Sequence, residues 1–271
     1  MKKSRIDWCD SSWNPVTGCF HDCKYCYARR IANRFGGASE THSNEAVWKE
    51  CQWMTEATGE VHVLNVPVYD YDRGHNAPYP FEFDPTFHKY RLKDYEKITG
   101  RNIFVCSMAD LFGKWVPDEW IQEVFQACDR ADRNNYLFLT KNPGRYIELA
   151  DKGLLPGRHW YGYSATKQAD LWEFTHADDC PVTNLFVSIE PILEPIKPAF
   201  CSHCPADWVI VGAETGNRKE KVIPRREWIE EIVTICEYSG IPLFMKSSLA
   251  EIWEKPLIQQ FPDQLKKGGS E

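Results

Sequence analysis

Hydrophobic residues along the chain gather in short continuous runs, and most of these runs are followed by a helical pattern. Six such runs fall at 102–107, 136–141, 159–165, 184–190, 207–214 and 242–247. Runs that are apolar throughout, rather than at alternate positions, are typical of strands in a parallel sheet covered on both faces. Between them, the pattern predicts helices after Pro117, from an Asn142–Pro143 start to Leu149, near 167–177, and over 225–238.

The order strand, helix, strand predicts an α/β fold, either a doubly wound sheet or a (β/α) barrel. We expect a partial (β/α)6-type, TIM-like barrel of parallel strands over residues 1–247, followed by a C-terminal extension over 248–271. Segment 36–100 is rich in Tyr, His, Pro and Asp and has poor periodicity. We interpret it as an insertion after the first βα unit, a lid or a substrate surface, with a strand at 81–83 and a helix near 86–98.

Polar residues gather at the carboxyl ends of the predicted strands. They are Ser107, Asp110, Lys141, Ser164, Ser188, Glu190, Glu214 and Lys246. In barrels this end carries the chemistry, although any one of these residues could be polar only because it meets solvent. The ring is therefore a candidate site, and the charged residues at 141, 190, 214 and 246 are the candidates for catalysis.

The formal charge of −7 and a pI of about 5.7 do not indicate a surface built as a whole to bind nucleic acid. One basic run, RKEKVIPRREW at 218–228, could contact phosphate or nucleic acid, or could be a solvated loop and helix start. The first residues lack the apolar core of a signal peptide, and no apolar run reaches the roughly 18 residues of a membrane span. We expect a soluble, cytoplasmic protein that is not bound to a membrane.

Three cysteines stand close together in the stretch TGCFHDCKYCYARR at 17–30. Cys19, Cys23 and Cys26 have the spacing C-x3-C-x2-C, and disulfides are improbable in the cytoplasm. A closed zinc site needs four ligands, and no fourth ligand is evident here unless His21 supplies it. Three thiolates and one open position suit a [4Fe–4S] cluster better. A zinc ion and unliganded buried thiols remain the alternatives.

A second cysteine pair lies at Cys201 and Cys204, with His203 between them. A lone C-x2-C pair is moderate support for a metal site, and Cys180 could add a third ligand to a zinc ion or an auxiliary cluster. A tight turn without metal is the other interpretation.

The cysteine spacing, with Tyr25 just before the last cysteine, resembles the signature of the radical S-adenosylmethionine (SAM) superfamily. The stretches WNPVTGC, SMADLFG, LTKNPGRY, VSIEP and VGAETG look like a phage-associated radical SAM-like family, and the resemblance spans residues 5–247. It implies a [4Fe–4S] cluster on the three cysteines, with SAM chelated by the open iron. An external electron donor would then drive cleavage of SAM to a 5′-deoxyadenosyl radical that abstracts hydrogen from substrate. Some members occur beside a three-Cys-motif partner protein.

The resemblance also implies roles for single residues. Tyr25 would lie against the adenine, and Ser107 to Asp110 stand where the superfamily has a Gly-Gly-Glu motif that binds the amino group of SAM. The residues at 164 and 188 are candidates for ribose or carboxylate contacts, and the acids at 190 and 214 for contacts to SAM or substrate. Gly212 would let the backbone approach a ligand, unless it only makes a tight turn.

Two hypotheses follow. The first is a radical SAM enzyme whose substrate is unidentified, with a nucleotide or a nucleic acid as the candidate class. The alternative is a non-catalytic, zinc-stabilised accessory protein that binds nucleic acid.

Overall fold

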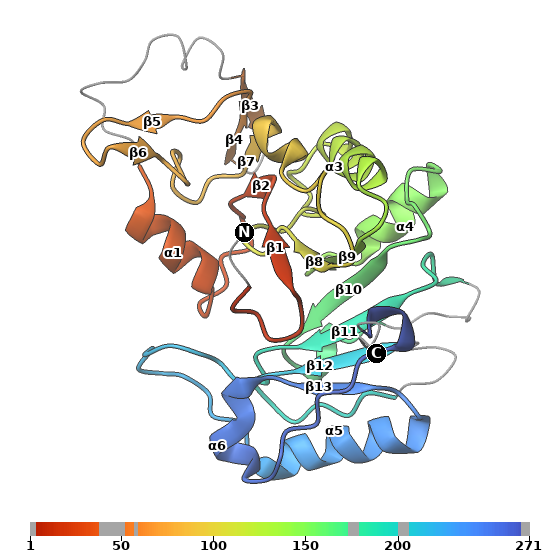
Figure 1. Cartoon of the computed structure of the whole chain (residues 1–271). Coiled ribbons are helices and arrows are strands. Elements are labelled where there is room, and N and C mark those ends of the chain that lie inside the picture. The colour runs from red at the N-terminus through yellow and green to blue at the C-terminus, as the bar shows by residue number, and fades with distance from the viewer. Residues whose placement is uncertain (1–3, 38–51, 57–58, 173–178, 200–205, 267–271) are drawn as a thin grey trace.

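A curled sheet of seven parallel strands forms the centre of the computed structural model, which describes residues 4–37, 52–56, 59–172, 179–199 and 206–266 (Figure 1). In spatial order the strands are β1 (Ser11–Trp13), β8 (Asn102–Val105), β9 (Asn135–Thr140), β10 (Trp160–Ala165), β11 (Leu185–Ile189), β12 (Trp208–Val211) and β13 (Leu243–Met245). The six apolar runs become β8 to β13, so the predicted parallel α/β sheet is confirmed. The short strand β1 is a seventh, and the sheet closes into only half a barrel.

Three helices lie on the outside of this half-barrel (Figure 1): α3 (Asp118–Arg130), α4 (Gly144–Asp151) and α5 (Arg226–Ser239). The helix α1 (Tyr27–Phe35) instead packs against Phe83 and Met108, and the short α6 (Ala250–Trp253) follows β13. The start of α4 differs slightly from the prediction, because the Asn142 side chain donates to the carbonyl of Phe112 instead of capping the helix. The helix expected near 167–177 is wrong over 167–172, where only a 3-10 turn, Gln168–Asp170, forms; residues 173–178 lie outside the described part.

The segment 36–100 contributes three of the four strands of a second, smaller sheet. Its strand order is β2 (Val16–Thr17), β7 (Thr86–His88), β4 (Gly59–Leu64) and β3 (Gln52–Glu56), and β5 (Tyr69–Asp70) pairs separately with β6 (His75–Asn76). The strand predicted at 81–83 and the helix predicted near 86–98 are both wrong. Residues 86–88 form β7 instead, followed by a 3-10 turn over Lys89–Lys93. The pairing of β7 with β2 and β4 is tertiary, and local sequence does not show it.

Inward-facing side chains of the main sheet form layers inside the half-barrel. The lower layer is aromatic: Phe186 lies in register with Trp208, and Trp8 packs against both rings. Successive side chains of a strand alternate between faces, so residues two and four positions after Phe186 point into the same lumen. These residues are Ser188 and Glu190. The sequence thus places a polar layer directly above a water-excluding aromatic one.

The C-terminal segment closes the edge of the sheet beside β13. The amide of Met245 donates to the carbonyl of Ile258 at 2.7 Å, and the amide of Gln260 donates to the carbonyl of Leu243 at 2.9 Å. Further along, the Asn102 side chain donates to the carbonyl of Leu265 at 2.8 Å, which ties this segment to β8. No helix among the described residues is both long enough and apolar enough to cross a membrane.

A buried histidine makes the stability of this fold depend on pH. His159 is 2% exposed and stacks on Phe125, and burial lowers its pKa from the usual 6.5 to about 3. The pKa of His159 is lower in the folded protein than in the unfolded chain. Its neutral form therefore contributes fully to the free energy of unfolding above pH 6.5, and this contribution is lost as the pH falls toward 3. Protonation of His159 in the unfolded chain should lower the free energy of unfolding by about 2 kcal/mol between pH 7 and pH 5. We expect His159→Phe to abolish this decrease.

Urea denaturation at the two pH values measures this difference. His75 is exposed, so His75→Phe is the matched control and should leave the pH dependence as it is in the parent chain. An unchanged pH dependence in His159→Phe would show that the buried imidazole does not cause it.

Candidate functional site

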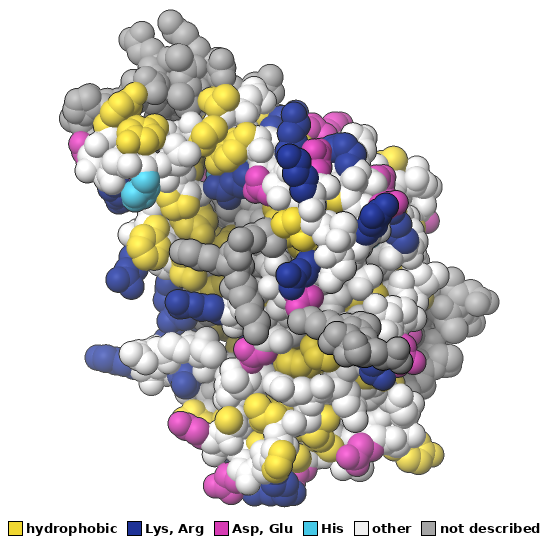
Figure 2. Space-filling model, viewed as in Figure 1, with side chains coloured by type: hydrophobic (Ala, Val, Ile, Leu, Met, Phe, Trp, Pro, Cys, Tyr) yellow, Lys and Arg dark blue, Asp and Glu magenta, His cyan; other side chains and the backbone are white. Residues whose placement is uncertain are grey.

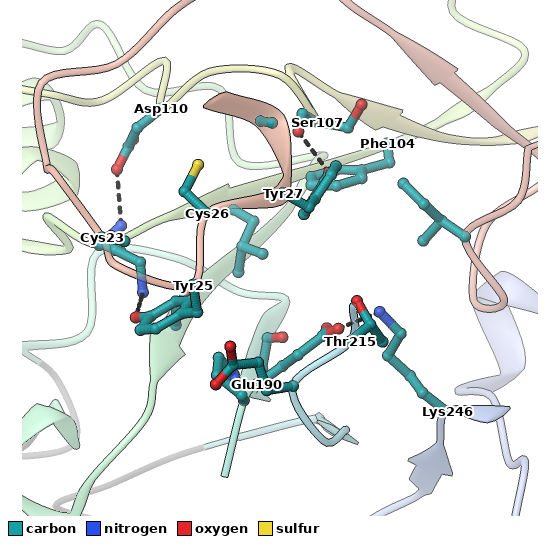
Figure 3. A pocket seen from close by; sticks show the side chains of 18 of the residues that line it. Cys23, Tyr25, Cys26, Tyr27, Phe104, Ser107, Asp110, Glu190, Thr215 and Lys246 are labelled. Carbon is teal, nitrogen blue, oxygen red and sulfur yellow. Dashed lines mark hydrogen bonds and ion pairs between the residues drawn. The ribbon is translucent and has the colours of Figure 1, made fainter. Parts of the chain in front are cut away.

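A cavity of about 480 Å³ opens at the carboxyl ends of the main-sheet strands. The side chains singled out from the sequence that line it are Cys19, Cys23, Tyr25, Cys26, Ser107, Asp110, Lys141, Ser164, Ser188, Glu190, Glu214 and Lys246. Figure 3 shows Tyr25, Cys26 and Tyr27 on one side of the cavity and Glu190, Thr215 and Lys246 on the other. The structure therefore brings together residues that are more than two hundred positions apart in the chain.

The cysteine loop is fixed to the body of the protein by its first residues. Gly18 has a φ of +86°, and a Cβ there would lie 2.2 Å from the carbonyl oxygen of Asp84, so only glycine fits. Its amide donates to the carbonyl of Met108, and the amide of Cys19 donates to that of Phe83. The loop therefore enters the cavity in one defined position.

Backbone amides point at two of the three sulfurs. The amide of His21 lies 3.5 Å from Sγ of Cys19, and the amide of Arg29 lies 3.3 Å from Sγ of Cys26, which caps α1. Hydrogen bonds of this kind stabilise a thiolate and help to set the potential of an iron–sulfur cluster. The donors are in place for sulfurs that carry negative charge.

Two of the free thiols are nevertheless harder to ionise than an ordinary cysteine. Burial raises the pKa of Cys19 to about 12, and it also raises the pKa of Cys23. All three cysteines are unpaired, so none is held in a disulfide. Across the described ranges, no three His, Cys, Asp or Glu side chains converge closely enough to hold a single metal ion.

Asp110 ties the cysteine loop to the sheet. Its carboxylate accepts hydrogen bonds from the amide of Phe112, the hydroxyl of Thr140, the amide of Lys141 and Nε2 of His21, at 2.7 to 3.0 Å. A carboxylate has about four acceptor positions, and these donors occupy them all. A ligand amino group could bind Asp110 only by displacing one of these donors, so the carboxylate is placed to position His21.

Tyr25 is held by Lys141, a cation that directly follows β9. The ammonium of Lys141 donates to the hydroxyl of Tyr25 at 3.0 Å and lies 5.3 Å from the centre of its ring (Figure 3). This contact orients the ring toward the cavity and brings a positive charge near Cys23.

The opposite wall carries two charge pairs. Lys246 forms an ion pair with Glu190, and both side chains lie over Gly212, where a Cβ would meet them at 3.1 and 3.3 Å. Gly212 is therefore covered and is not among the residues that line the cavity. Glu214 accepts two hydrogen bonds from Arg218, at 2.7 and 2.8 Å, and this contact lowers the pKa of the carboxyl.

The two serines predicted to contact the ribose or carboxylate of SAM lie side by side. Ser164 and Ser188 are in register on β10 and β11, and both line the cavity. Ser107 lies on the far wall, where its hydroxyl donates to the side chain of Asn14.

Sequence analysis did not predict Tyr27 as a site residue, and it considered His21 only as a possible fourth ligand of a zinc ion. The hydroxyl of Tyr27 donates to the carbonyl of Ser107 at 2.6 Å, and its ring lines the cavity. The available signal was position: Tyr27 directly follows Cys26, the N-cap of α1, so it lies beside the cysteine loop. The second cysteine pair, Cys201 and Cys204, lies outside the described residues, and Cys180 donates to the carbonyl of Val182.

Comparison with protein families gives one match, to the family described as "Protein of unknown function (DUF5131)", over residues 3–255. No curated protein and no solved structure matches the chain.

Proposed function

From the premise that the chain belongs to the DUF5131 family, we propose that it is a radical SAM enzyme with a [4Fe–4S] cluster on Cys19, Cys23 and Cys26. The observation that carries the proposal is the placement of three unpaired thiols on one wall of a cavity whose other walls are polar. When bound, the cluster and SAM would supply a 5′-deoxyadenosyl radical that abstracts hydrogen from the substrate.

The donor set supports a cluster more than a zinc ion. A zinc ion draws its ligands to one point, whereas a cluster binds each cysteine to a different iron. The loop brings three thiols to one cavity, the number of protein ligands that a cluster with one open iron needs. The amides of His21 and Arg29 would stabilise the bound thiolates, and Lys141 would offset part of their charge.

The remaining residues provide a site for SAM and substrate. A volume of about 480 Å³ is within the range of small-molecule sites. Tyr25 offers a fixed ring for the adenine, and Ser164 and Ser188 offer hydroxyls for the ribose or carboxylate. Glu190 and Lys246 present opposite charges, and the aromatic layer below keeps water out from beneath. A nucleotide or a nucleic acid is the proposed substrate, and an external donor supplies the electron.

Reconstitution without oxygen tests the proposal. We expect about four irons per chain and, with a strong reductant, formation of 5′-deoxyadenosine from SAM. Colourless protein with about one equivalent of zinc would instead support the non-catalytic, nucleic-acid-binding alternative. Activity in protein without iron would contradict the proposal.

A further inference from the structure

An exposed apolar stripe runs along α1 from the cavity mouth. Tyr27, Ile31 and Phe35 recur every four residues, so they share one face of the helix, and they are 42%, 37% and 47% exposed. Tyr27 and Ile31 also line the cavity. From Tyr27 to Phe35 the stripe covers about 12 Å at the rise of an α-helix. One end of an outward-facing surface is thus continuous with the candidate site.

The same helix is strongly basic. It contains three arginines and no acidic residue, although the whole chain has a charge of −7. Neither Arg30 nor Arg34 forms an ion pair with any carboxylate in the described part of the chain. Arg30 instead donates to the carbonyl of Thr215, and Arg34 lies 5.2 Å from the ring of Phe35.

A second basic segment faces this helix across the cavity mouth. The loop after β12 bears Lys219 and Lys221, and Figure 2 shows dark blue side chains gathered over α1 and this loop. Acidic groups at the rim have partners: Asp22 pairs with Arg29, Asp7 accepts from the amide of Ser247, and the exposed Glu220 of the loop lies 4.0 Å from Arg218. The rim therefore presents cations to solvent in an otherwise acidic protein.

We propose that α1 and the loop 215–221 form a track that binds single-stranded nucleic acid and leads one nucleotide into the cavity. Aromatic side chains bind single strands because they stack on bases, and basic side chains beside them contact the phosphates. In a duplex the bases are stacked on one another and are not accessible to such rings. The role of the cavity in this inference rests on the proposed function, whereas binding along the track does not.

Fluorescence anisotropy with labelled DNA and RNA strands of about 12 nucleotides tests the track, because single-stranded binding sites fall within this length. Using the reconstituted chain, we expect Phe35→Ala to weaken binding of a single strand by about tenfold. The double variant Arg30→Gln/Arg34→Gln should lower the slope of log Kd against log salt by about 1.4, because two phosphate contacts are lost. Separate DNA and RNA arms show which sugar is preferred.

Matched controls come from the opposite parts of the surface. Tyr238 on α5 is 92% exposed and Arg133 lies in the exposed turn before β9, so Tyr238→Ala and Arg133→Gln should leave Kd unchanged. Equal effects of control and track variants would overturn the proposal. So would equally tight binding of a duplex of the same length, or self-association of the chain that Phe35→Ala abolishes.

The two proposals can fail separately. Binding is measured without turnover, and it is repeated with Cys23→Ala, which lacks a complete set of cluster ligands. Cleavage of SAM without any binding of single strands would overturn the track alone. Track-dependent binding in a chain that never holds iron would overturn the radical SAM proposal alone.

Discussion

Replacement of Cys23 by alanine is expected to abolish reductive cleavage of SAM and to lower the iron content of the reconstituted chain. Cys23 lines the cavity between the other two thiols in sequence, and two cysteines cannot hold a cluster that needs three protein ligands. The side chain is only half-buried, so its removal should cost the fold no more than about 1 kcal/mol. Iron analysis, 5′-deoxyadenosine formation and urea denaturation measure the three effects.

Cys180→Ala is the matched control for this substitution. Cys180 is also half-buried and unpaired, but it is not among the residues that line the cavity. It should retain SAM cleavage. If Cys23→Ala instead cleaved SAM as the parent chain does, the cysteine loop would not be the site of the cluster.

The main sheet could be predicted because each of its strands carries its own signal. A run such as NLFVSIE is apolar at every buried position of β11 except Ser188, so its length and composition are sufficient to identify the strand. Alternation then places Ser188 and Glu190 in the lumen without any knowledge of the neighbouring strands. For the same reason the ring of polar strand ends could be predicted as one cavity.

The second sheet could not be predicted in this way. The strand β7 is only three residues long, and all of Thr86, Phe87 and His88 are buried, so neither alternation nor length distinguishes it. Its partners, β2 and β4, are separated from it by long stretches of chain. Strand pairing of this kind depends on tertiary contacts that a local window does not contain.

The positions of the polar residues in the site could be predicted from the sequence, but their hydrogen-bond partners could not. It placed Asp110 and Glu214 at strand ends as candidates for contacts to SAM or substrate, yet Asp110 accepts from four donors of the protein and Glu214 from Arg218. Such contacts depend on which loops meet above the sheet. Because of these contacts, we interpret the two residues as groups that position the surrounding loops and no longer as candidates for direct contact with a ligand.

Replacement of Asp110 by alanine is therefore expected to lower the free energy of unfolding by about 3 kcal/mol, because buried donors lose their acceptor. Asp110 is 5% exposed, and the donors that face it come from the cysteine loop, from the turn after β8 and from the end of β9. Without the carboxylate, His21 loses its link to the sheet, and the loop that holds the three thiols is less well positioned. We expect the iron content after reconstitution to fall together with stability.

Two further variants separate the loss of one hydrogen bond from the loss of the whole network. Thr140→Val removes one donor to Asp110 and should cost about 1 kcal/mol while the loop keeps its link through His21. Asp110→Asn keeps one acceptor oxygen and turns an amide nitrogen toward two donors, so its cost should fall between those of the other two variants. If Asp110→Ala unfolded at the same urea concentration as the parent chain and bound iron equally well, the carboxylate would not join the cysteine loop to the sheet.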